Sequence, residues 1–583
     1  MFSNAIPNLK TYLKKDLTST RYFVQGKGEI KLTRSDFKAQ GGEGSIYVKG
    51  ATAYKIYLDP TRTISSQKIL ELSALSQSNI IRPMDILLNR QNLPVGYSMR
   101  NVGNSYSLCQ LFPRAFRQRN NLTPELTLKL VRQLQEGVAH VHNNGILIVD
   151  LNELNFLVAK DFRELFFIDV DSYQTTSFPA TVLMESVRDR HSQVFTTNTD
   201  WFSFAIVSFQ MFTGIHPFKG TYPPLQQLPD AASKLNARML SNVSVLHHGV
   251  TVPMSCLSFA AIPPVYLDWF RAVFEEGKRL APPKDVLPQI ILRPAVTTPA
   301  SITGTAFLIT RLREFDSPIL SHDGSVTITE KSVYFDGKRF EKPAFDVKVV
   351  VTPRQRHVIA AFIDSSGLHL RDLTRSREIE TNIKAEDMSV CAGQLFLKQA
   401  ESIFAVDFVE LPNQILVGIK LIANVMMRAT QLFEGLAFQN LLGAIYASIF
   451  VSRGGAFQVR LPELDGHQIV DAKLERNVLV VVIVKNGSYD KLIYRFSKQF
   501  DAYDVRVIRD IATTGIEFTV LDSGVVLQLT DDDKLEIFSV VRGSTSNKTL
   551  SDAGLVGEVR LFHTGVQALF ARGAELYRIQ LKA

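Results

Sequence analysis

The sequence predicts a two-part protein, with an α+β N-terminal half over residues 1–285 and an all-β C-terminal half over residues 304–583. Short strand-like runs alternate with helical patterns in the first half, whereas in the second half one β-type unit recurs and helical patterns nearly vanish. Between them, residues 286–303 form a proline-rich stretch without periodicity, which is typical of a linker.

The composition indicates an ordinary globular protein and excludes several other classes. With 45% hydrophobic and 21% charged residues, the 583-residue chain is neither disordered nor collagen-like. Three distant cysteines without CxxC spacing predict neither a disulfide framework nor a cysteine-based zinc site. The longest aliphatic run, residues 478–484, is far shorter than the ~20 residues that cross a bilayer. We therefore expect a cytoplasmic protein without a membrane span.

The charge is unevenly distributed along the chain. The net charge is +8, and residues 1–150 contain 20 basic and 10 acidic residues, an excess of +10. A polyanionic ligand or partner is therefore expected to bind the N-terminal half. At this chain length, however, the total charge is mild and does not predict nucleic-acid binding.

Two helices stand out in the N-terminal half. The first is predicted over residues 124–143, where Thr123 can cap the start, Pro124 occupies the first helical position and Gly145 follows the end. The second, over residues 200–213, is apolar on nearly every side, which predicts a buried central helix.

The C-terminal half repeats a unit of two apolar β-type runs joined by a polar turn. The mean spacing of roughly 40 residues is the blade period of a β-propeller, and the length predicts six or seven blades. An irregular pair of β-sandwiches is the alternative, because no WD or kelch signature is present. The units span 332–340, 357–373, 393–408, 444–461, 478–496, 524–540 and 565–581.

A glycine-rich turn and a lysine are the first candidates for phosphate chemistry. Gly41, Gly42 and Gly44 would let backbone N–H groups approach phosphate oxygens, and Lys55 interrupts a strand-like run TAYKIY where its ammonium could hold phosphates. Glu71, in the helical segment SSQKILELSALS, could fix that ammonium. Taken singly, each has an ordinary explanation: a tight turn, an edge-strand lysine and a solvated helix charge.

Three further polar residues lie inside apolar strand-like runs. Asp150 and Asn155 occur in GILIVDLNELNFLV, and Asp169 follows in LFFIDVDSY. Buried charges are costly unless they are paired or bind a metal. Asp150 is therefore a candidate base, and Asn155 and Asp169 are candidate oxygen ligands for Mg²⁺.

In this order and spacing, residues 30–285 resemble a protein kinase domain. TAYK is similar to the family's VAIK, DLNELN to the second part of HRDLKPEN, and FIDVDSYQ to the DFG region, while Asp200 opens the buried helix. The segments GGEGSIY, DLNELNFLV and FIDVDSYQ look like a group of bacterial kinases, some encoded beside phosphatases and tellurium-resistance genes.

The resemblance implies an extension at 1–29, a kinase N-lobe at 30–104 and a C-lobe at 105–285, with ATP and Mg²⁺ as cofactors. Its catalytic residues would be Asp150, Lys55 and Glu71, its metal ligands Asn155 and Asp169, and its nucleotide contacts Gly41, Gly42, Gly44, Ile46 and Lys55.

The sequence departs from the family pattern at several positions. Ile148 and Val149 replace the His-Arg before the catalytic Asp, which implies an activity independent of activation-loop phosphorylation. Val170 and Asp171 replace the Phe-Gly of DFG, and we expect Asp171 to cap a turn. Ala39 replaces the first loop glycine, Asn152 replaces a lysine, and residues 183–185 are the nearest candidate for an absent APE motif.

The expected function is that of a serine/threonine protein kinase whose β-propeller recruits a protein partner or substrate. Deletion of residues 300–583 would then spare generic phosphotransfer. A pseudokinase scaffold that binds nucleotide or partners without phosphotransfer is the alternative, and a small-molecule kinase of the same fold is a third.

Overall fold

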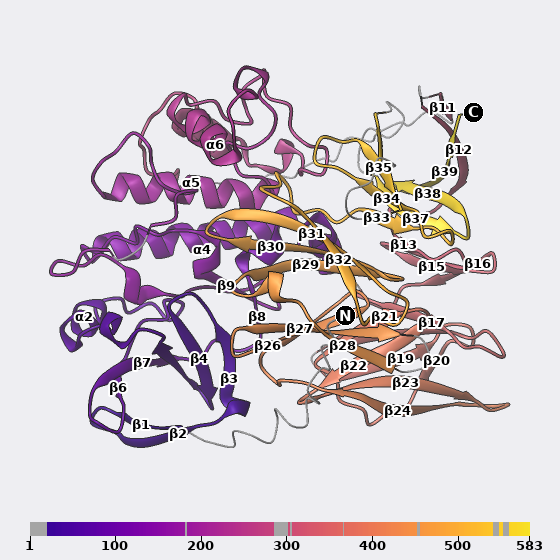
Figure 1. Ribbon diagram of the computed structural model, residues 1–583, viewed down its shortest axis with the longest axis horizontal. Coiled ribbons are helices and arrows are strands. Elements are labelled where there is room, and N and C mark those ends of the chain that lie inside the picture. Colours follow the sequence, from indigo (N-terminus) through magenta and orange to yellow (C-terminus); the bar gives the residue numbers. More distant parts are fainter. Residues whose placement is uncertain are drawn as a thin grey trace, which may run out of the picture.

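The computed structural model describes residues 20–180, 183–284, 301–303, 306–344, 346–364, 366–451, 455–539, 547–551 and 559–582. The first 19 residues of the expected N-terminal extension, the last residue of the expected C-lobe and residues 286–300 of the expected linker lie outside these ranges. In Figure 1 the α+β part and the β-rich part lie side by side.

A seven-stranded antiparallel sheet in the order β2-β1-β6-β7-β5-β4-β3 forms the first layer. The helix α2 (Ser66–Leu72), capped by Ser65, packs against it. The strands are β1 (Thr20–Val24), β2 (Gly28–Leu32), β3 (Phe37–Gln40), β4 (Gly44–Lys49), β5 (Thr52–Tyr57), β6 (Asp85–Leu88) and β7 (Pro94–Arg100), with short 3-10 helices η1 (Arg34–Asp36) and η2 (Pro60–Arg62).

The following segment, residues 105–274, is mainly helical. Its small sheet has the order β10-β9-β8. Its elements are β8 (Ser105–Ser107), η3 (Leu108–Leu111), α3 (Arg114–Arg119), α4 (Pro124–Asn143), η4 (Glu153–Asn155), β9 (Phe156–Ala159), β10 (Leu165–Phe167), η5 (Val170–Ser172), α5 (Thr197–Thr213), η6 (Pro223–Leu225), α6 (Ala231–Leu240), η7 (Phe259–Ala261) and α7 (Pro264–Phe274).

Both predicted helices are confirmed. Helix α4 has the predicted bounds, and its N-cap Thr123 accepts a hydrogen bond from the Leu126 N–H. Helix α5 begins three residues earlier than predicted, because Thr196 caps it, and it is buried from Thr199 to its end. None of the helices in the described ranges combines the length and apolarity that crossing a bilayer requires.

The described residues of the C-terminal part form seven antiparallel sheets, and each predicted β unit is a pair of neighbouring strands in one of them. Six sheets have four strands. The last three of these four-stranded sheets along the chain contain β25 (Thr430–Phe433), β26 (Leu436–Leu441), β27 (Ala444–Val451), β28 (Gly455–Arg460), β29 (Gln468–Glu475), β30 (Val478–Lys485), β31 (Ser488–Phe496), β32 (Tyr503–Ile508), β33 (Phe518–Val520), β34 (Val526–Leu529), β35 (Leu535–Phe538) and β36 (Lys548–Leu550).

The preceding four-stranded sheets contain β13 (Ile319–His322), β14 (Val326–Thr329), β15 (Ser332–Phe335), β16 (Lys338–Glu341), β17 (Lys348–Val351), β18 (Val358–Asp364), β19 (Gly367–Asp372), β20 (Arg377–Ile379), β21 (Asp387–Cys391), β22 (Gln394–Gln399), β23 (Ser402–Glu410) and β24 (Ile415–Asn424). A 3-10 helix, η8 (Pro462–Leu464), follows β28.

The remaining sheet joins the two ends of the C-terminal part. Strands β11 (Ser301–Thr303) and β12 (Phe307–Glu314) pair with the last strands of the chain, β37 (Arg560–Thr564), β38 (Gln567–Arg572) and β39 (Glu575–Leu581), in the order β11-β12-β39-β38-β37. The β12 and β39 strands are antiparallel, with Phe307 opposite Leu581.

The two parts of the chain share one hydrophobic core. On β30, Val478, Val480, Val482 and Val484 belong to the same buried cluster as the residues of α4 and α5, whereas the alternate residues belong to a cluster within the β-rich part. Because side chains alternate along a strand, both faces of β30 are buried. This position explains why residues 478–484 form the longest aliphatic run in the sequence.

Candidate functional site

Lys55 lies at the centre of a buried polar cluster. It occupies the middle of β5, opposite Ile46 of β4 and Tyr97 of β7, and its side chain is 6% exposed. Its Nζ atom lies 2.6 Å from Asp169 Oδ1 and 2.8 Å from Asp171 Oδ2. Burial alone would lower the pKa of Lys55, but the negative charges of Asp171 and Asp169 outweigh it and raise this pKa well above its usual value. The lysine is therefore held in its charged form.

Asp171 is the most completely bonded carboxylate of this cluster. Besides Lys55, the hydroxyls of Tyr57 and Tyr97 donate hydrogen bonds to it, at 2.5 and 2.7 Å. Burial would raise the pKa of Asp171, but the Lys55 charge and these hydrogen bonds lower it overall. Our expectation that Asp171 caps a turn is wrong, because its side chain instead fixes the lysine.

The expected pair between Lys55 and Glu71 is not formed. Glu71 accepts hydrogen bonds from the Ser177 N–H and the Gln67 amide, at the partly exposed side of α2. The buried face of α2 comprises Lys68, Ile69 and Leu72, and Glu71 lies outside it. Glu71 is therefore separated from Lys55 because it lies on a different face of α2 from the buried residues.

Lys68 faces the acidic cluster from α2. It is 4% exposed, and burial lowers its pKa, although the charge of Asp171 opposes that shift. A second lysine thus lies near the carboxylates, at the side of the cluster where the family resemblance had implied an acid.

The glycine-rich turn between β3 and β4 covers the cluster. Gly41 and Gly42 have open space where a Cβ would lie, whereas a Cβ on Gly44 would approach the Ile56 carbonyl oxygen to 2.7 Å. Between them, Glu43 lies 3.6 Å from Lys55 Nζ, and its other oxygen lies 2.6 Å from Arg62. An acidic side chain of the turn therefore lies beside the ammonium that phosphates would contact.

Three carboxylates gather closely enough to bind one cation. Oxygen atoms of Glu43, Asp169 and Asp171 lie within 4.8 Å of one another. Such an oxygen donor set fits Mg²⁺. Glu43 and Asp169 are partly exposed, and in Asp169 burial together with the charge of Asp171 raises the pKa, while Lys55 opposes the shift. Asp169 is thus the acid best placed to exchange a proton or a lysine contact for a metal ion.

Asp150 lies on a loop whose backbone is hydrogen-bonded to Asp200 of α5. The Asp200 carboxylate accepts hydrogen bonds from the Ile148 and Val149 N–H groups at 2.8 and 2.9 Å, and it lies 2.9 Å from His142 Nε2. Val149 has a φ of 65°, a strained conformation for a β-branched residue. The buried Asp200 therefore stabilises an unfavourable backbone turn immediately before Asp150.

The Asp150 carboxylate itself has two hydrogen-bond donors. Its Oδ1 atom accepts a hydrogen bond from the Met184 N–H at 2.7 Å, and its Oδ2 atom is 3.3 Å from the Asn155 amide nitrogen. Burial raises the pKa of Asp150, and these hydrogen bonds oppose the shift. Asn155 also donates to the Asp150 carbonyl. Asn155 thus supports Asp150 through its amide nitrogen.

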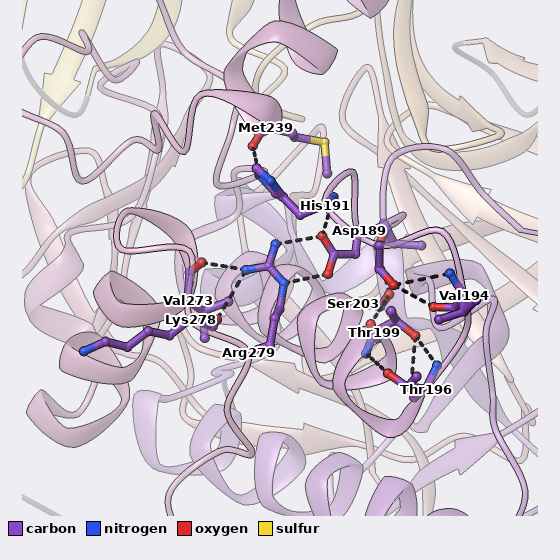
Figure 2. Close-up of polar contacts among 12 residues, drawn as sticks. Asp189, His191, Val194, Thr196, Thr199, Ser203, Met239, Val273, Lys278 and Arg279 are labelled. Atoms are coloured by element: carbon purple, nitrogen blue, oxygen red, sulfur yellow. Dashed lines mark hydrogen bonds and ion pairs between the residues drawn. The ribbon is translucent and has the colours of Figure 1, made fainter.

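A buried ion pair anchors the segment that follows the site. Figure 2 shows Asp189 bound by two nitrogens of Arg279, at 2.6 and 2.7 Å. By contrast, Glu185 is exposed and pairs with Arg188 and Arg190 on the surface. The residues 183–185, expected as the nearest counterpart of an APE motif, therefore do not provide the buried acid of this segment.

The structure thus brings together Lys55, Asp169 and the glycine-rich turn, and it separates Glu71 from them. The sequence analysis missed the roles of Asp171 and Asp189. A signal for Asp171 was present, because it is a second charged residue within the apolar run LFFIDVDSY.

Comparisons with known proteins support a kinase-like domain. No family model matches the chain. "Protein kinase YegI" of Escherichia coli K12 is 24% identical over 204 residues, which is 31% of this chain and 31% of that protein. A "Dual specificity protein kinase pyk3" of Dictyostelium discoideum is 25% identical over 214 residues, 34% of this chain and 15% of that protein. The chain therefore spans about a third or less of the length of these curated relatives.

A solved structure, that of the Cydia pomonella granulovirus kinase PK-1, matches 42% of this chain and 91% of its own at 15% identity, with a TM-score of 0.31.

Proposed function

We propose that this chain is an ATP- and Mg²⁺-dependent protein kinase of the serine/threonine type, which transfers the γ-phosphate to a protein hydroxyl. The observation that carries the proposal is the buried Lys55 ammonium, held 2.6 Å from Asp169 and 2.8 Å from Asp171. Phosphoryl transfer needs positioned charges more than covalent chemistry, and this cluster supplies such charges beside the glycine-rich turn.

Each residue has a role that its surroundings support. Lys55, kept charged by Asp171, would bind phosphate oxygens, and Asp150 would orient the substrate hydroxyl and accept its proton. Burial raises the pKa of Asp150, which makes it a better base than an exposed aspartate. Asp169, with the neighbouring carboxylates of Glu43 and Asp171 and with Asn155 as the family resemblance implies, would hold Mg²⁺, which supplies charge neutralisation on the transferring group.

Two contacts favour the pseudokinase scaffold as a second candidate. Glu43 lies 3.6 Å from Lys55, where it would compete with phosphates for the ammonium. The Met184 N–H donates to Asp150 Oδ1 at 2.7 Å and occupies one oxygen of the expected base.

Nucleotide binding and transfer, measured separately, distinguish the two functions. Mg²⁺ and ATP together should raise the melting temperature of the full chain, and Asp169→Asn should abolish the Mg²⁺-dependent part of that increase. Radiolabelled transfer from [γ-³²P]ATP to a generic protein substrate would then support the kinase. Stabilisation without any transfer would support the scaffold.

We also infer that the seven sheets are the blades of a β-propeller, closed by the pairing of β12 with β39. The inference is supported by contacts between the first strands of successive sheets, β17 with β21, β21 with β25, and β25 with β29. Similar contacts connect β33 and β13 with β37. An irregular pair of sandwiches would not give this succession.

The role of the β-rich part in recruiting a protein partner or substrate remains our proposal. Because one side of it shares the core of the kinase-like part, recruitment would use the surface that this contact leaves free.

A further inference from the structure

A tight hairpin of the β-rich part reaches the expected catalytic loop. Strands β30 and β31 pair up to Lys485 and Ser488, so that Asn486 and Gly487 alone form the turn. Both have positive φ values, 51° and 73°. This is the geometry of a two-residue type I′ turn, in which Asn-Gly is strongly preferred. The turn is therefore short and stiff, and it can hold a neighbouring segment in place.

The tip of this hairpin packs against the segment that contacts Asp150. A Cβ built on Gly487 would overlap the Ser186 hydroxyl and would lie 2.9 Å from Met184 Sδ. The carbonyl of Ser186 lies 3.0 Å from the Nε2 atom of buried His216. Met184 and Ser186 therefore pack against the hairpin tip, with no room for a side chain at position 487.

The first tyrosine of β31 makes a second contact, with the catalytic loop itself. The Tyr489 hydroxyl donates a hydrogen bond to Glu153 Oε1 at 2.7 Å. Glu153 is 2% exposed and lies three residues after Asp150. Burial raises the pKa of Glu153, and the Tyr489 hydrogen bond opposes the shift. A buried carboxylate without donors is costly, and Tyr489 supplies a donor to Glu153 from the other part of the chain.

Both contacts involve residues that lie next to Asp150. The Met184 N–H binds Asp150 Oδ1, and Glu153 belongs to the same short loop as Asp150. The arginine that the family resemblance places before the catalytic Asp, which would clamp a phosphorylated segment, is replaced by Val149. Other contacts hold residues 183–189: Arg279 binds Asp189 at the end of this segment, and the hairpin tip packs against Met184 and Ser186 at its start.

We propose that the β30–β31 hairpin, through Gly487 and Tyr489, positions the Met184–Ser186 segment and the Asp150 loop for phosphotransfer in place of a phosphorylated activation segment. Tyr489 and Gly487 are positioning residues, because they act through Glu153 and Met184. The inference rests on the proposed kinase function and assigns the β-rich part a role inside the site.

Two variants of the full chain test this role. Tyr489→Phe removes only the hydroxyl, and Gly487→Ala forces the tip away from Ser186. We expect kcat to fall about tenfold in each, with the KM for ATP unchanged, because neither contact involves Lys55 or Asp169. Hydrogen exchange of peptides covering residues 183–195 should accelerate in both variants.

Matched controls come from the same β-rich part. Gly337 occupies a two-residue Asp-Gly turn between β15 and β16, with a φ of 77° and open space around a built Cβ. Gly337→Ala therefore has the same backbone strain without the contact. Tyr577→Phe removes a tyrosine hydrogen bond to Glu575 within β39. Both controls should keep the kcat and the exchange rates of the wild type.

The outcomes separate this proposal from the kinase function. If the wild type transfers phosphate and the Tyr489 and Gly487 variants match their controls in kcat and in exchange, the positioning role is overturned and the kinase remains. Equal losses in variants and controls would also overturn it, because they would indicate general destabilisation. If the wild type transfers no phosphate, the kinase function fails and the positioning role fails with it.

Discussion

Replacing Asp171 by Asn removes one negative charge from the buried cluster and leaves the shape of the side chain almost unchanged. The wild-type carboxylate accepts three hydrogen bonds, from Lys55, Tyr57 and Tyr97. Breaking one partner of a buried ion pair costs about 3–5 kcal/mol. Lys55 keeps Asp169 at 2.6 Å, so we expect the lower end of this range, about 3 kcal/mol, in the free energy of unfolding.

Glu71→Gln is the matched control for this prediction. It also removes one carboxylate charge, but at a partly exposed position that does not contact Lys55, so the expected loss is within about 0.5 kcal/mol. Urea denaturation followed by circular dichroism measures both free energies, and ATP titration should show weaker binding only for Asp171→Asn. If Glu71→Gln costs as much stability or affinity as Asp171→Asn, the assignment of Asp171 as the partner of Lys55 is refuted.

Three further predictions follow from the same contacts. The acid limb of the pH profile of kcat/KM should lie above the ordinary aspartate pKa of about 4, because burial raises the pKa of Asp150 and the base is lost as the pH falls through that pKa. An acid limb at or below pH ~4 would contradict this assignment. A chain ending at residue 300 should aggregate or lose cooperative unfolding, because the β30 valines belong to the core of α4 and α5. This result would contradict the expectation from sequence that the deletion spares phosphotransfer. A fragment that is monomeric on gel filtration and binds ATP would disprove the prediction. Phosphatase treatment should leave the rate of phosphate transfer unchanged, and a large loss would show that phosphorylation orders the Met184–Ser186 segment. Alanine substitution of Thr196 and Thr199 is a poorer test, because these residues cap α5.

Local patterns explain what could be predicted from the sequence. Helix α4 has a cap, a proline at its first position and a stop glycine, all within one segment. Lys55 and Asp169 each interrupt an apolar strand-like run, and such charges are retained only where they are paired or bind a metal. The seven β units were recognisable because alternating side chains and glycine turns are also local features.

Contacts between distant segments explain what could not be predicted. The partner of Lys55 depends on which face α2 turns inward. The family resemblance implied Glu71, whereas the structure buries Lys68 and Leu72. Likewise, Tyr489 and Glu153 are separated by 336 residues, and neither has a local signal that indicates the other. The family resemblance pointed only to residues of the first part of the chain, whereas the Tyr489 hydroxyl that binds Glu153 comes from the second part.

Transfer of ³²P from [γ-³²P]ATP by the full-length chain, compared with Asp150→Asn in the presence of Mg²⁺, tests the central claim most directly. Asn keeps an oxygen acceptor for the Met184 N–H but does not take up a proton, so the fold and ATP binding should persist. We predict transfer by the wild type and a loss of about 100-fold or more in the variant. Equal transfer by the two proteins, or none by either while both bind Mg²⁺ and ATP, would contradict the assignment of this site as a kinase active site.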